Sequence, residues 1–162
     1  PERAAKVLSK YLDDYDGAGL LSALDKAYSK FEGDPAPLVK IDDGIYILEL
    51  WHGPTCAFKD MALTVLPYLL RKGCDICVIN EQILILVATS VDTGKAALEG
   101  FTDAEGIKIL VFYPDDGVSK MQKLQMCTHE GTPVNVFAVK VHFPDCQTAS
   151  KQLFAREEYA HI

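Results

Sequence analysis

The sequence has no surplus of positive charge. Its 162 residues include 16 Lys and Arg against 23 Asp and Glu, which gives a formal net charge of −7 at pH 7. A nucleic-acid groove needs clustered Lys and Arg that outnumber their acidic neighbours, and the sequence contains no such stripe. We therefore expect no DNA or RNA partner.

Long apolar runs are also missing. The longest strongly apolar run, Ile83 to Ala88, is far shorter than the roughly 20 residues that a helix needs to cross a bilayer. The chain does not open with the cationic and apolar segments of a secretion signal. From these features we expect a cytoplasmic protein without a membrane partner.

The sequence also lacks a disulfide framework. The five cysteines are odd in number and scattered among apolar runs, which indicates reduced thiols rather than disulfides. The one CxxC motif, Cys74 to Cys77, has no second pair and no His at zinc-ligand spacing. We interpret it as a connection between a helix and a strand, and we expect no metal.

The first 50 residues predict a helical portion that ends in a strand. Apolar residues make up 49% of the chain and charged residues 24%, the mixture of a folded globular domain. Helical spacing of apolar residues covers 4–15 and 20–31, with a break around Asp16-Gly17. A loop at 33–37 and a strand at 45–50 follow.

Residues 51–162 predict an α/β domain. Short apolar runs typical of buried parallel strands occupy 83–88, 107–113 and 134–141. Helical segments between and after them occupy 94–101, 119–127 and 145–159. This alternation predicts a parallel sheet with flanking helices, in which ligands bind beyond the carboxyl ends of the strands.

One lysine, Lys59, stands where a Gly-Pro loop meets the expected start of a helix. The helix dipole disfavours a cation at that position, so the neutral amine is easier to reach. Schiff-base chemistry needs the neutral amine. The alternative is a solvated lysine paired with the neighbouring Asp60, and the residues alone leave both interpretations open.

A hydroxyl-rich turn, Thr89 to Lys95, follows the expected strand at 83–88 and precedes a helix. Backbone N–H groups at such a helix start can receive an anion. The turn lacks the first glycine and the magnesium-binding Ser or Thr of a P-loop, so we do not expect a nucleotide site. Two interpretations of the turn stay open: a binding site for a carboxylate or phosphate, or an ordinary capped junction between a strand and a helix.

Residues 48–63, Leu-Glu-Leu-Trp-His-Gly-Pro-Thr-Cys-Ala-Phe-Lys-Asp-Met-Ala-Leu, closely resemble the cofactor-lysine segment of the threonine synthases. The resemblance continues in the family's order through 85–94, 111–126 and 143–153. It implies a fold-type II pyridoxal 5'-phosphate enzyme, tryptophan synthase β-like, that converts O-phospho-L-homoserine and water into L-threonine and phosphate. It also implies that the C-terminal part of the family fold lies outside this chain.

The resemblance also implies which residues form the site. Lys59 would be the catalytic residue and would hold pyridoxal 5'-phosphate, with Phe58 beside it. Three further cofactor-binding residues, Ser90, Asp92 and Thr93, lie in the turn that corresponds to the family's Ser-Gly-Asp-Thr-Gly. The implied partner is the small-molecule substrate O-phospho-L-homoserine, and the oligomeric state, monomer or homodimer, stays open.

The sequence departs from the family pattern in the same turn. Val91 stands where the family has glycine, and Val141 replaces a second glycine before Phe143. Glycine often supplies a backbone conformation that a β-branched residue resists. These departures keep open the alternative of a noncatalytic threonine-synthase-like fragment that acts as a binding module.

Overall fold

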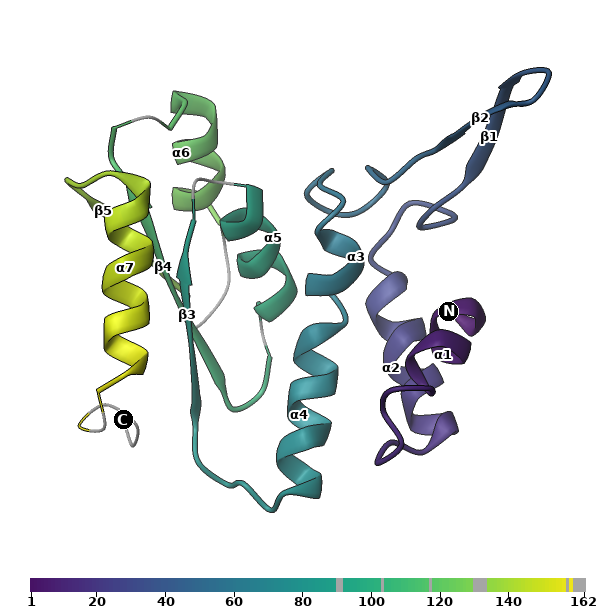
Figure 1. The fold of residues 1–162 in the computed structure, drawn as a ribbon, viewed down its shortest axis with the longest axis horizontal. Helices are drawn as coiled ribbons and strands as arrows, with labels where there is room; N and C mark the ends of the chain where they lie inside the picture. Colours follow the sequence, from purple (N-terminus) through teal and green to yellow (C-terminus); the bar gives the residue numbers. More distant parts are fainter. Residues whose placement is uncertain (90–91, 103, 117, 130–133, 157, 159–162) are drawn as a thin grey trace. The chain divides into compact units, whose positions relative to one another are not determined.

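The computed structural model describes residues 1–89, 92–102, 104–116, 118–129, 134–156 and 158. The chain divides into two compact units, Pro1–Asn80 and Glu81–Ile162, which we call unit 1 and unit 2 (Figure 1). The break falls between a helix and a strand. The division expected from the sequence, 1–50 and 51–162, concerns the domains of the family fold rather than these compact units. It stays a prediction.

Unit 1 contains four helices, α1 (Glu2–Leu8), α2 (Gly17–Tyr28), α3 (Asp60–Leu63) and α4 (Leu66–Ile76). The carboxylate of Asp16 caps α2 by accepting a hydrogen bond from the Gly19 N–H at 2.6 Å. One face of α2 is buried in the core of unit 1. The buried residues of this face are Leu20, Leu24 and Ala27, and they form one cluster with Val65. The two predicted helices are confirmed, although α1 ends well before residue 15.

An antiparallel hairpin of β1 (Leu38–Asp42) and β2 (Ile45–Leu48) completes unit 1. Its register runs from Leu38 opposite Leu48 to Asp42 opposite Ile45. Every residue of both strands is exposed, including large apolar side chains such as Leu38 and Tyr46. The prediction of β2 is confirmed, whereas β1 was not predicted.

Unit 2 is built on a three-stranded parallel sheet of β3 (Ile83–Ala88), β4 (Ile107–Pro114) and β5 (Val134–Val139). Strand β4 lies in the middle, with Ile83 opposite Ile107 and Ile109 opposite Val134. The three predicted strands and their parallel arrangement are confirmed.

Helices cover both faces of this sheet (Figure 1). They are α5 (Asp92–Phe101), α6 (Lys120–Cys127) and α7 (Phe143–Phe154). Val111 of β4 faces Gly94 of α5, whereas the next residue, Phe112, lines a cavity with Cys146 of α7. The predicted α/β class, a parallel sheet with flanking helices, is therefore confirmed.

Three features bear on membranes, metals and cysteine chemistry. Over the described residues, no helix is both long and apolar enough to cross a bilayer. The same residues hold no group of three or more side chains arranged to bind a metal. All five cysteines are free thiols, and the CxxC motif is the last turn of α4, with Cys77 as its C-cap on the way to β3.

Candidate active site

The candidate lysine lies at the end of an irregular segment, residues 49–59, which we call the lysine loop. The loop connects β2 to α3, and Lys59 is the last residue before α3 begins at Asp60. Its backbone is already in the right-handed helical region. The predicted position of Lys59 at a helix start is thus confirmed.

Asp60 is fully buried and faces back into the lysine loop. Its carboxylate accepts two hydrogen bonds from Thr55, one from the backbone N–H at 2.8 Å and one from the hydroxyl at 2.6 Å. Among the residues that the structure describes, Lys59 makes no ion pair. The alternative of a lysine paired with Asp60 is therefore wrong.

The turn that Asp60 closes is tight. A Cβ added at Gly53 would lie 2.6 Å from the Cβ of Asp60, a distance at which no real side chain fits. The Gly53 carbonyl accepts a hydrogen bond from the Cys56 N–H at 3.0 Å, and Cys56 adopts a positive φ of 57°. Positive φ is uncommon outside glycine and costs backbone energy, so surrounding contacts must hold this turn in place.

A second set of contacts fixes the start of the lysine loop. The imidazole Nε2 of His52 lies 2.7 Å from Oε2 of Glu49, and the Trp51 ring stacks on the imidazole at 5.9 Å between centroids. The His52 carbonyl accepts a hydrogen bond from the Glu32 N–H at 3.0 Å. These contacts give His52 a scaffolding role in the lysine loop.

The amine of Lys59 is left accessible by this arrangement. The side chain is half-buried, and Nζ lies 5.6 Å from the centroid of the Phe58 ring, which is itself 62% exposed. Phe58 and Lys59 therefore lie together, as the resemblance implied. An exposed aromatic ring beside an amine without a counter-ion suits a planar aromatic ligand that carries a carbonyl.

The start of α5 holds two of the other residues that the resemblance implied, Asp92 and Thr93. Asp92 is exposed in the first turn and Thr93 is half-buried next to it. Ser90 and Val91 lie outside the described residues. Asp92 and Thr93 belong to unit 2, whereas Phe58 and Lys59 belong to unit 1.

Thr89 caps this helix, a role that sequence reasoning missed. Its buried hydroxyl accepts a hydrogen bond from the Gly94 N–H at 3.0 Å. The description of an ordinary capped junction thus fits this part of the turn. Because the Gly94 N–H already binds Thr89, it is not among the amide donors that a bound anion could use.

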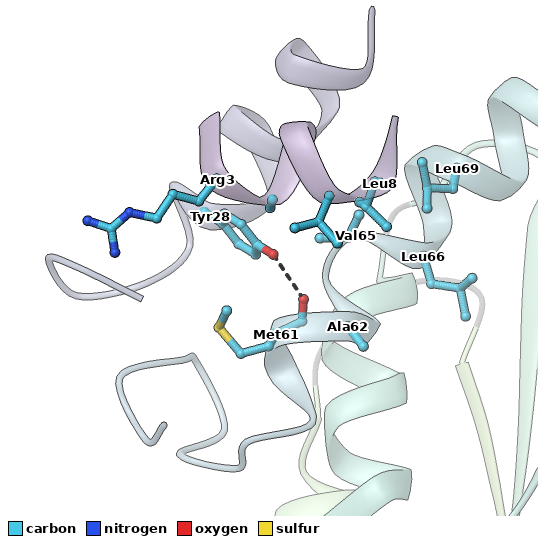
Figure 2. Close-up of a pocket in the computed structure, with 10 residues that line it drawn as sticks. Arg3, Leu8, Tyr28, Met61, Ala62, Val65, Leu66 and Leu69 are labelled. Carbon is cyan, nitrogen blue, oxygen red and sulfur yellow. Dashed lines mark hydrogen bonds between the residues drawn. The ribbon is translucent and has the colours of Figure 1, made fainter. Parts of the chain in front are cut away.

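Unit 1 also contains an apolar pocket of about 570 Å³. It lies between α1, the end of α2 and the segment from α3 to α4, and Figure 2 shows the Tyr28 hydroxyl pointing at the Met61 carbonyl, to which it donates at 3.4 Å. Burial raises the pKa of Tyr28. Lys59 is not among the lining residues, so this pocket is separate from the candidate amine.

Comparison with solved structures identifies the class first. O-ureido-L-serine synthase aligns with a TM-score of 0.56 at 16% identity, over 86% of this chain and 42% of that one. At this identity the likeness concerns the fold alone. Together with the PLP-bound structure described next, this likeness shows that the chain has part of the fold of the fold-type II pyridoxal-phosphate enzymes.

Closer relatives identify the family. A threonine synthase of Pseudomonas aeruginosa is 38% identical over 84% of this chain and 29% of its own length. The threonine synthase-like 2 protein of Rattus norvegicus is 38% identical over 82% of this chain and 27% of its own. A PLP-bound threonine synthase structure from Brucella melitensis aligns with a TM-score of 0.86 at 33% identity, over 97% of this chain and 34% of that one.

The chain belongs to the threonine synthase family and spans about a third of the length of the curated relatives it matches. No family model matches the sequence.

Proposed function

We propose that this chain supplies the cofactor lysine of a threonine synthase, a pyridoxal 5'-phosphate enzyme that converts O-phospho-L-homoserine and water into L-threonine and phosphate. The observation that carries the proposal is the position of Lys59, a half-buried residue at the start of α3 that makes no ion pair in the described part of the chain. The family match over most of the chain supports the same conclusion.

The residues in place fit the cofactor. The amine of Lys59 would hold its aldehyde carbon, and the exposed ring of Phe58 offers an apolar surface to a planar ring. We propose that Ser90, Asp92 and Thr93 also bind the cofactor, as the family resemblance implies. Pyridoxal phosphate, when bound, withdraws electrons from the substrate carbons next to the amine.

The work of the protein is then to orient groups and move protons. The lysine loop holds Lys59 by its backbone, through the buried carboxylate of Asp60 and the His52–Glu49 contact. Lys59 would serve as the general acid and base of the reaction, since a positioned lysine amine is one of the groups that move protons in active sites. Thr93 would offer its hydroxyl to the substrate carboxylate or to the cofactor.

The compartment and partners follow from the same proposal. Five free thiols fit a reducing compartment, and we place the reaction in the cytoplasm. The substrate is a small phosphorylated amino acid.

The test is capture of the cofactor by one named lysine. Purified chain is mixed with pyridoxal 5'-phosphate, its visible absorption is recorded before and after borohydride, and peptide mass spectrometry locates the modified residue. Lys59→Ala is the test variant. Lys72→Ala, which removes an exposed lysine of α4 in the same unit, is the matched control.

We expect a visible band and a borohydride-stable adduct at Lys59 in the parent and in Lys72→Ala, and neither in Lys59→Ala. Labelling spread evenly over the surface lysines, unchanged by Lys59→Ala, would overturn the proposal. That result would favour a noncatalytic member of the family that uses this fold to bind a partner.

A further inference from the structure

The acid next to Lys59 in the sequence is held away from it in space. Asp60 follows Lys59 directly, yet both of its carboxylate oxygens accept hydrogen bonds from Thr55. Asp60 is fully buried, whereas Lys59 is partly exposed and its amine lies over the Phe58 ring. Two adjacent residues of opposite charge therefore have separate environments.

This separation matters because the reactivity of the Lys59 amine depends on whether the Asp60 carboxylate binds Lys59 or Thr55. A carboxylate beside an amine stabilises the ammonium form, which cannot attack a carbonyl. A buried carboxylate needs hydrogen-bond donors, and it takes whichever donors lie within reach. In this loop the donors are the backbone N–H and the hydroxyl of Thr55, so the carboxylate is satisfied without Lys59.

The turn geometry supports the same contact. Gly53 has no room for a side chain beside Asp60, and Cys56 keeps a positive φ, so the chain between Gly53 and Asp60 is folded tightly around the Thr55 bond. Glu49, the other carboxylate of the lysine loop, is paired with His52 at 2.7 Å. Both acids of this segment are thus bound to partners other than the lysine.

We propose that Thr55 is a positioning residue for Lys59: it binds the Asp60 carboxylate and thereby keeps that charge away from the lysine amine, which stays available to a carbonyl ligand. The inference rests on the proposed function only in identifying the carbonyl ligand as pyridoxal phosphate.

Three variants separate this role from a general effect on folding. Thr55→Val removes the hydroxyl and keeps the shape, Thr55→Ser keeps the hydroxyl, and Asp60→Asn keeps an acceptor for Thr55 but removes the charge. Each purified variant is mixed with pyridoxal phosphate at one fixed pH, and the rate of borohydride-trapped labelling at Lys59 is measured. The double variant Thr55→Val with Asp60→Asn is included.

We expect Thr55→Val to slow capture at Lys59 about tenfold, because the released carboxylate can pair with the amine. Thr55→Ser should stay within about twofold of the parent, since serine offers the same donor. The double variant should regain most of the lost rate. Added salt should also speed capture by Thr55→Val, because salt screens a partly exposed pair.

A second readout does not involve the cofactor. Trace acetylation with acetic anhydride, with Lys72 as the internal reference, reports the reactivity of the Lys59 amine directly. If the parent fails to capture pyridoxal phosphate but Thr55→Val still lowers acetylation at Lys59, the proposed function fails while the positioning role stands. If the parent captures the cofactor and Thr55→Val leaves both rates unchanged, the positioning role fails alone.

Circular dichroism and thermal melting show whether each variant folds. If Thr55→Val does not fold, Asp60→Asn decides the matter, and we expect it to capture at least as fast as the parent. A folded Asp60→Asn that slows capture, or a double variant no faster than Thr55→Val, would assign the Thr55–Asp60 contact a structural role only and overturn the proposal.

Discussion

The buried hydroxyl of Thr89 accepts a hydrogen bond from the backbone N–H of Gly94, and the two residues are also in close packing contact. A Cβ added at Gly94 would lie 2.5 Å from Cγ2 of Thr89. This contact joins the end of β3 to the first turn of α5. The position of Asp92 and Thr93 in unit 2 therefore depends on a glycine that has no room for any larger residue.

Gly94→Ala should destabilise the chain by about 1–3 kcal/mol, because the new methyl group would also press on Val111 and Met126 at 3.3 Å. Urea unfolding followed by circular dichroism measures the change. Gly17→Ala is the matched control, since a Cβ at Gly17 meets nothing within 4 Å. Equal unfolding midpoints for Gly94→Ala and the parent would contradict the packing described for this junction.

Gly53→Ala should disturb the lysine loop more than the stability of the whole chain. The added methyl group would displace the side chain of Asp60 and so break its bonds to Thr55. We expect slower capture of pyridoxal phosphate at Lys59, measured by borohydride trapping. Gly17→Ala again serves as control, and capture at the parent's rate by Gly53→Ala would show that the loop does not need this close approach.

Leu24→Ala should destabilise unit 1 by about 2–5 kcal/mol, because Leu24 is fully buried against Val65 and the mutation leaves a cavity. Leu38→Ala removes the same atoms from the hairpin, where the side chain is 63% exposed, and should cost much less. Thermal melting of both variants tests the comparison. Equal losses would mean that the core of unit 1 lies elsewhere.

Acid should weaken unit 2 partly through Asp115. Lys123 donates a hydrogen bond to its carboxylate and attracts its charge, and together these lower the pKa of Asp115. A lowered folded-state pKa stabilises the fold above the ordinary carboxyl pKa of about 4, and this contribution is lost as the pH falls through the lowered value.

Lys123→Ala should therefore melt with a smaller drop in midpoint between pH 7 and acidic pH than the parent. Because both side chains are partly exposed, the difference should be small and should shrink in high salt. Lys120→Ala, an exposed lysine of the same helix, is the control and should keep the parent's pH response. A parent-like pH response in Lys123→Ala would show that the pair contributes nothing.

The sheet of unit 2 could be predicted because its signal is local. Runs such as Ile83 to Ala88 are apolar without interruption, and only a buried strand or a helix core accommodates them. The end of α1 could not be predicted in this way. Apolar spacing continues to Tyr15, but that residue donates its hydroxyl to the Leu69 carbonyl at 2.6 Å, a tertiary contact that helical spacing does not reveal.

The candidate site, too, could be predicted from the sequence only in part. A helix start at Asp60 follows from the pattern, and so does the placement of Lys59 before it. The partner of Asp60 does not, because the nearest cation in the sequence is the obvious choice and Thr55 becomes the partner only when the loop is folded. Ser90 lies outside the described residues, and its role stays a prediction.

The bond between Thr55 and Asp60 joins residues only five positions apart. Closing so short a segment costs little chain entropy, and the contacts that close it come from within unit 1. During synthesis, the loop that carries Lys59 could therefore reach its final shape once unit 1 has left the ribosome, before the sheet of unit 2 is made. The backbone of Lys59 would then be held in its loop before unit 2 is made.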